Sequence, residues 1–97
     1  MSHLSADDHK RRAAFVHDLR EAINDSGKSQ ADLAMHLGYE NRNVVSMFKS
    51  GRMRVPVAKV PVLARWLGLD AATLLRNWFA AYDPDALPVI TAHFGAR

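Results

Sequence analysis

The sequence contains no cysteine and no long uninterrupted hydrophobic run. Without cysteine the chain forms neither disulfide bonds nor cysteine-ligated zinc sites, a composition that suits the reducing cytoplasm. No apolar run approaches the roughly 18 residues that a membrane-spanning helix needs. Residues 1–10 also lack the hydrophobic centre of a signal peptide. We therefore expect a soluble, cytoplasmic protein.

The sequence also lacks the motifs of common enzymes and cofactor sites. It has no nucleophile motif and no glycine-rich phosphate loop. Its five histidines include no pair at metal-ligand spacing. We therefore expect no catalytic residues, no metal and no cofactor.

The 97 residues predict a single domain with a slight positive charge, because 13 Lys and Arg against 10 Asp and Glu give +3. This balance is compatible with a polyanionic partner but does not demand one. The distribution is more informative, since Asp32 and Glu40 are the only acidic residues between positions 27 and 59. The basic residues in that range are Lys28, Arg42, Lys49, Arg52, Arg54 and Lys59.

Apolar residues recur at three- and four-residue intervals over most of the chain, which predicts helices. The expected helices begin near Ala6, after Ser29, near Asn41, near Val57 and after Asp70. Ser5 with Asp8 and Ser29 with Asp32 have the spacing of a capping box, and Asp70 is the expected cap of the last helix. If the fourth helix begins near Val57, Pro61 falls in its first turn, where its missing N–H would have had no partner. The segment from Leu87 to Phe94, LPVITAHF, is compatible with one β-strand. The sequence thus predicts an all-α domain of five helices at residues 6–82, after a flexible N-terminus at 1–5 and before a C-terminal tail at 83–97.

Residues 30–49 have the pattern of two short helices joined by a tight turn. Ala34 lets the helices approach closely. Gly38 lies where the first helix must end, in a left-handed conformation that costs other residues about 1 kcal/mol or more. Val44 and Met47 are three residues apart and are expected to be buried against the first helix. The opposite face of the second helix would then point outward.

The same pattern extends into the flanking sequence. It includes Ser29-Gln30, Leu33-Ala34, Leu37-Gly38, the loop from Gly51 to Pro56, and Ala64 with Leu67-Gly68-Leu69. Over about residues 10 to 80 the chain resembles the lambda-repressor/Cro-like (XRE-type) helix-turn-helix family. This resemblance implies a five-helix DNA-binding fold with residues 30–49 as the DNA-binding unit.

The outward face of the second helix of this unit carries side chains that suit the major groove of DNA. Amide and guanidinium groups make paired hydrogen bonds to adenine and guanine, and a branched apolar side chain touches the thymine methyl. The expected base-reading residues are Asn41, Arg42, Val45 and Ser46, and the resemblance assigns this role to Asn41, Arg42 and Ser46. The expected phosphate-binding residues are Ser29, Gln30, Asn43, Lys49, Arg52 and Arg54.

Glu40 is out of place in such a unit, because its carboxylate would lie near phosphate oxygens. It either caps the following helix or pairs with Arg42. Alternatively, the amides of Asn41 and Asn43 fix the position of Arg42.

The C-terminal part is more apolar than a small monomer can easily bury, which predicts a homodimer. The expected dimer contacts are Leu75, Trp78, Phe79, Tyr82, Val89, Ile90 and Phe94. The alternative is that the tail folds back on its own core.

The function that these patterns favour is a transcription regulator, a repressor that binds a palindromic operator in double-stranded DNA as a homodimer. One alternative is an antitoxin or adaptor of the same fold whose apolar C-terminal region binds a protein partner. Another is a protein that packages nucleic acid without sequence preference. The sequence patterns alone leave all three open.

Overall fold

The computed structural model describes residues 5–93, and every regular element within that range is helical. The elements are α1 (Ala6–Asp25), α2 (Gln30–His36), α3 (Asn43–Ser50), the 3-10 turn η1 (Val57–Lys59), α4 (Val60–Leu67), α5 (Ala71–Tyr82) and α6 (Ala86–His93). The expected all-α class is confirmed. None of these helices is both long enough and apolar enough to cross a membrane.

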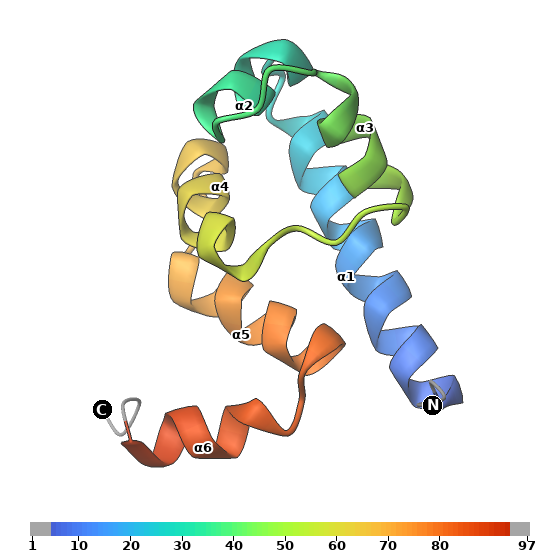
Figure 1. Ribbon diagram of the computed structural model, residues 1–97, viewed down its shortest axis with the longest axis vertical. Coiled ribbons are helices and arrows are strands. Elements are labelled where there is room, and N and C mark those ends of the chain that lie inside the picture. Colours follow the sequence, from blue (N-terminus) through green and yellow to red (C-terminus); the bar gives the residue numbers. More distant parts are fainter. Residues whose placement is uncertain (1–4, 94–97) are drawn as a thin grey trace.

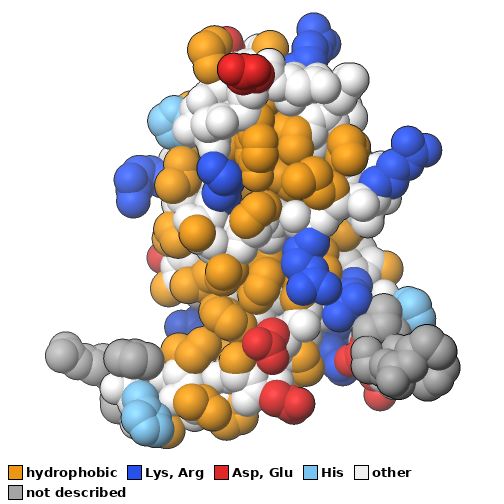
Figure 2. Space-filling model, viewed as in Figure 1, with side chains coloured by type: hydrophobic (Ala, Val, Ile, Leu, Met, Phe, Trp, Pro, Cys, Tyr) orange, Lys and Arg blue, Asp and Glu red, His pale blue; other side chains and the backbone are white. Residues whose placement is uncertain are grey.

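The helices form two sides of the molecule (Figure 1). α1 runs along one side with α3 packed against it, and α4 and α5 form the other side. An extended loop at 51–56 crosses between them, and α2 and α6 lie at opposite ends. Apolar side chains fill the space between the two sides (Figure 2), so the centre of the molecule is packed.

Three of the helices begin at side-chain caps, as the sequence predicts. The hydroxyl of Ser5 accepts from the Asp8 amide, and the Asp8 carboxylate accepts from the Ser5 amide, each at 3.1 Å. Ser29 caps α2 with its hydroxyl, which accepts from the Asp32 amide at 3.2 Å. Asp70 caps α5, where its carboxylate accepts from the side chain and the backbone of Thr73, which hold the pKa of Asp70 below its ordinary value.

The C-terminal ends of α2 to α5 share another feature, which is a basic side chain that donates to a backbone carbonyl. Such carbonyls have no partner within their own helix and carry the negative end of its dipole. The pairs are Lys59 with Leu37 O, Arg20 with Lys49 O, Lys28 with Trp66 O, Arg11 with Ala80 O and Arg12 with Ala81 O. Basic residues far apart in the sequence therefore tie the helices to one another.

The core joins all of α1 to α5. Its fully buried side chains are Leu19, Leu33, Val45, Phe48, Val55, Val60 and Leu63. Trp78 closes one edge of this core, because its indole is buried and donates to the Val55 carbonyl at 2.8 Å. This hydrogen bond ties α5 to the loop that leads from α3 to α4.

Residues 86–93 form a helix, and the expected β-strand is wrong. The helix follows a turn in which the amide of Ala86 donates to the Asp83 carbonyl at 3.1 Å. Pro88 falls in the first turn, where its missing N–H would have had no partner in the helix. A helix satisfies its own backbone, whereas a strand needs a second strand, and residues 5–93 offer none. Phe94 lies outside the described residues.

The expected fourth helix, Val57 to Leu67, is divided into η1 and α4. Pro61 lies in the first turn of α4, as the sequence predicts. A 3-10 turn at the start lets the chain enter the helix without needing an N–H from that proline.

Replacing Trp78 with phenylalanine should lower the free energy of unfolding by about 1–3 kcal/mol, because the buried Val55 carbonyl loses its donor. Urea denaturation followed by far-ultraviolet circular dichroism measures this change. Trp66→Phe is the control, since the Trp66 ring is only partly buried. An equal effect of the two changes would contradict the assigned role of Trp78.

Candidate nucleic-acid interface

The turn between α2 and α3 has the expected geometry. Gly38 has a φ of +91°, which confirms the left-handed conformation. The amide of Tyr39 then donates to the Ala34 carbonyl at 2.9 Å, which folds the chain back over the end of α2. Ala34 and Leu33 are each 1% exposed, so α2 is packed closely against its neighbours.

The rotation of α3 differs from the one that the sequence suggests. Val44, Val45 and Phe48 are its buried residues, whereas Met47 is 38% exposed. The expectations that Val45 points outward and that Met47 is buried are both wrong. Phe48 decides the rotation, because it offers the largest apolar area on α3 and lies on the same side as residues 44 and 45.

The outward face of α3 therefore differs from the expected one, although it keeps Ser46. The exposed residues of this face each lie three or four positions from two of the others; they are Asn43, Ser46, Met47 and Ser50. Together with Arg52 they line a shallow, open hollow of about 380 Å³. Met47 was missed as a surface residue, although counting from Phe48 as the buried position would have found it.

The start of α3 is fixed by an amide. The side-chain oxygen of Asn41 accepts from the Asn43 amide at 2.9 Å, so the helix begins at Asn43 rather than at the expected Asn41. Glu40 is exposed and has no ion pair among residues 5–93. Arg42 is exposed beside Asn41 and no hydrogen bond within the described chain engages its guanidinium. Among residues 5–93 the structure supports none of the alternatives for this segment, because Glu40 makes no capping bond and the Asn41 side chain holds the Asn43 backbone rather than Arg42.

α2 and α3 are connected by a side-chain contact at their outer edge. The Ser46 hydroxyl donates to the side-chain oxygen of Gln30 at 3.0 Å, and Ser46 itself is exposed. Gln30 is the first residue of α2, where backbone N–H groups are free to bind an anion. The contact places a predicted phosphate-binding residue directly beside a predicted base-reading residue.

The predicted phosphate-binding residues do not all lie together. Ser29 uses its hydroxyl to cap α2, and Lys49 is half-buried at the end of α3. Arg52 is exposed beside the outward face of α3. Arg54 lies apart, with its guanidinium 4.5 Å from the centre of the Tyr82 ring.

The basic excess of residues 27–59 is smaller than the sequence suggests, because Lys28 and Lys59 donate to helix ends. Arg42, Lys49 and Arg52 remain available to bind a polyanion within residues 30–49 or beside the outward face of α3. Among the described residues, no group of three side chains is placed to hold a metal ion.

The predicted dimer residues are covered to different degrees. Trp78 is buried in its own core and offers no surface to a partner. Leu75, Phe79, Tyr82 and Ile90 are half-buried, whereas Val89 on α6 is 60% exposed. The surface that remains for a partner thus lies on α6 and the adjoining part of α5.

Comparison with protein-family models found no match, and neither curated proteins nor solved structures gave one.

Replacing Val45 with alanine should destabilise the protein by about 1.5–3 kcal/mol, because two fully buried methyl groups are lost and a cavity remains. Met47→Ala, two positions along the same helix, is the control and should cost much less. Chemical denaturation of both variants checks the rotation of α3. A larger loss for Met47→Ala would contradict it.

Proposed function

We propose that the protein is a sequence-specific regulator that binds double-stranded DNA through α2 and α3, in a lambda-repressor-like arrangement. The observation that carries this proposal is the exposed edge formed by Arg42, Asn43 and Ser46. These side chains sit at and near the start of a short helix, with no acidic residue on that helix. An α-helix fits the major groove, and residues at its start reach the base edges.

Each proposed base-reading residue has a distinct chemical task. The Arg42 guanidinium makes two parallel hydrogen bonds to O6 and N7 of guanine. The Asn41 amide nitrogen stays free to donate, although its oxygen already holds the start of α3. The Ser46 hydroxyl donates its proton to Gln30, which orients it, so its oxygen can accept from an amino group on a base edge. Val45 is buried and takes no part.

Positioning on the DNA backbone falls to another set of groups. The free N–H groups at the start of α2, with Gln30, suit one phosphate. Lys49, Arg52 and Asn43 bracket the exposed side of α3 and suit phosphates on either side of the groove. We propose that the protein acts as a repressor by occupying its operator, with no cofactor.

A homodimer would give this regulator a palindromic operator. The proposed contact surface consists of Leu75, Phe79, Val89 and Ile90 on α5 and α6. A two-fold axis there would carry two copies of α3, and half-sites on one face of DNA lie about 34 Å apart. In this dimer the helices α5 and α6 of one copy would pack against those of the other, because residues 86–93 form a helix and not a strand.

The same α6 surface supports a second candidate function. Val89 is 60% exposed on a helix whose main contacts are with α5 alone. An antitoxin or adaptor would use this surface to hold an unrelated protein, with DNA binding secondary or absent. Co-purification with one defined partner would favour this candidate.

Replacing Arg42 with alanine should change which DNA sequences are selected from a random pool, because a bidentate contact to guanine is worth about 1–3 kcal/mol of discrimination. The wild type should select a palindromic consensus, and Arg42→Ala should lose preference at one base pair of each half-site. Arg65→Ala removes an exposed arginine on α4 and is the control. Arg52→Ala should weaken binding to all DNA sequences alike and should lower the dependence of DNA affinity on salt concentration. No enrichment by the wild type would contradict sequence-specific binding, and binding without a consensus would indicate nucleic-acid packaging.

Sedimentation at micromolar concentration should show a dimer, and truncation after Asp83 should give a monomer with weaker operator binding, since α6 is removed. Circular dichroism should confirm that the truncated chain keeps its remaining helices. A monomeric wild type, together with unchanged operator affinity after truncation, would eliminate the dimer.

A further inference from the structure

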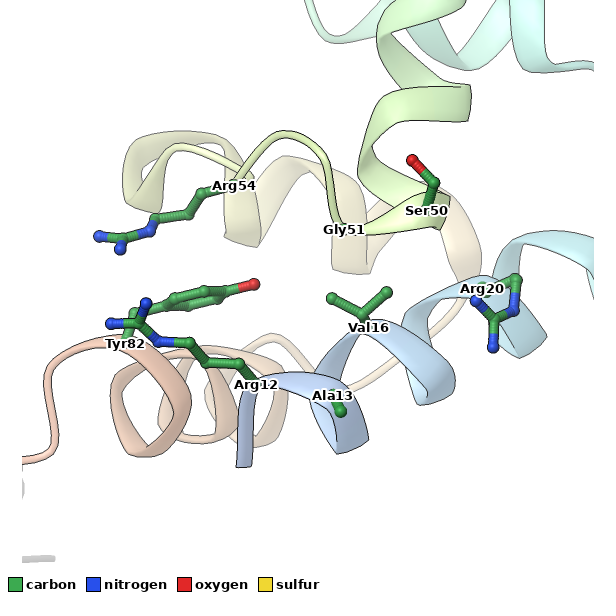
Figure 3. Close-up of a pocket in the computed structure, with 8 residues that line it drawn as sticks. All are labelled: Arg12, Ala13, Val16, Arg20, Ser50, Gly51, Arg54 and Tyr82. Atoms are coloured by element: carbon green, nitrogen blue, oxygen red, sulfur yellow. The ribbon is translucent and has the colours of Figure 1, made fainter. Parts of the chain in front are cut away.

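A second basic site adjoins the C-terminal end of α3, where Ser50 lines both this site and the hollow beside the exposed face. It is an open pocket of about 460 Å³ between α1, the end of α3 and α5. Its lining contains three arginines and no acidic residue, and Figure 3 shows the side chains that surround it. The lining residues are Arg12, Ala13, Val16, Arg20, Ser50, Gly51, Arg54 and Tyr82.

The centre of the basic part is the Tyr82 ring. Figure 3 shows it between the side chains of Arg54 and Arg12, with its hydroxyl directed toward Val16. The guanidinium carbons lie 4.5 Å and 5.2 Å from the ring centre, respectively. The two guanidiniums cannot be farther apart than these two distances combined. Because the ring lies between the two guanidiniums, a phosphoryl group that contacts both must lie beside the edge of the ring.

Part of this charge has a partner in the protein. Arg12 donates its Nε to the Ala81 carbonyl and Arg20 donates to the Lys49 carbonyl, each at 3.1 Å. A helix end carries about half a negative charge, so the ends of α3 and α5 together offset about one of the three guanidiniums. Attraction to the Tyr82 ring explains where Arg12 and Arg54 lie but neutralises neither.

In the part of the chain that the structure describes, the remaining charge has no carboxylate partner. Ion pairs among residues 5–93 join Arg11 with Asp8 and His17 with Glu21, and neither involves an arginine of the pocket. Arg54 makes no hydrogen bond within the described chain, so its five donors are available. Burial raises the pKa of the Tyr82 hydroxyl, while Arg54 and Arg12 oppose this shift, so at neutral pH the hydroxyl remains a donor.

We propose that this pocket is a phosphoryl-binding site in which Arg54 and the free Nη groups of Arg12 hold the anion. The size of the pocket exceeds that of one phosphate and falls in the range of small-ligand sites. The phosphoryl group belongs either to a free phosphorylated small molecule or to the backbone of bound DNA. Only the second source rests on the proposed function.

The test uses pyrophosphate as the probe and the full chain as the protein. Titration at low salt, followed by the NMR signals of the arginine Nε–H groups, should shift Arg12 and Arg54. Arg54→Gln should weaken pyrophosphate binding by about tenfold or more, because charge-assisted hydrogen bonds are lost. Arg54 is exposed and makes no hydrogen bond, so this variant keeps the fold. Arg65→Gln makes the same change of charge on α4, and this variant should bind pyrophosphate as tightly as the wild type does.

The outcomes separate the two sources. Binding of free pyrophosphate that Arg54→Gln weakens and Arg65→Gln does not supports a free phosphorylated ligand. If pyrophosphate does not bind, the salt dependence of DNA binding decides. A slope of log affinity against log salt that falls by about one in Arg54→Gln, and not in Arg65→Gln, indicates that the phosphoryl group belongs to the DNA backbone. Equal effects of the two variants overturn the site. If the protein binds no DNA, the proposed function fails separately, and the pyrophosphate titration alone decides the site.

Discussion

The burial of one face of α3 is the constraint on which the rest of the proposed interface depends. Val45 and Phe48 are almost completely removed from water, and together with Val44 they fix how the helix is rotated against α1 and α2. One position along a helix turns a side chain by about 100°, so an error of one residue moves some side chains between the buried and the exposed face, as Val45 and Met47 show. The proposed interface therefore follows from packing, since the groups proposed to contact DNA are those that the core leaves outside.

The basic residues of this chain perform two physically different tasks. Arg11, Arg12, Arg20, Lys28 and Lys59 donate to carbonyls at helix ends, and these bonds join segments up to 69 residues apart in sequence. Others project into solvent beside α3. The first group already donates hydrogen bonds to helix ends. At those ends the net charge of +3 therefore overstates the positive charge that is free to attract a polyanion. In the pocket around Tyr82 it understates the local density of positive charge.

The expectations that were confirmed rest on local chemistry. Ser5 and Asp70 cap helices because the groups involved lie within one turn of each other, and Gly38 takes the left-handed conformation that other residues avoid. The failures concern choices between two structures that the local sequence fits equally well. LPVITAHF has a strand-like composition, but the turn after Tyr82 and a proline in the first turn suit a helix. Residues 5–93 contain no strand that could pair with it.

The sequence by itself determined the helical class, the caps, the turn at Gly38 and the neighbourhood of the candidate interface, because each depends on residues a few positions apart. Tertiary structure alone decided that Val45 faces inward, that Trp78 belongs to the core through its bond to Val55, and that Lys28 and Lys59 are engaged. It also decided the pocket, since Arg12, Arg54 and Tyr82 come from three separate segments. Such contacts depend on how whole helices pack, and no local pattern records that.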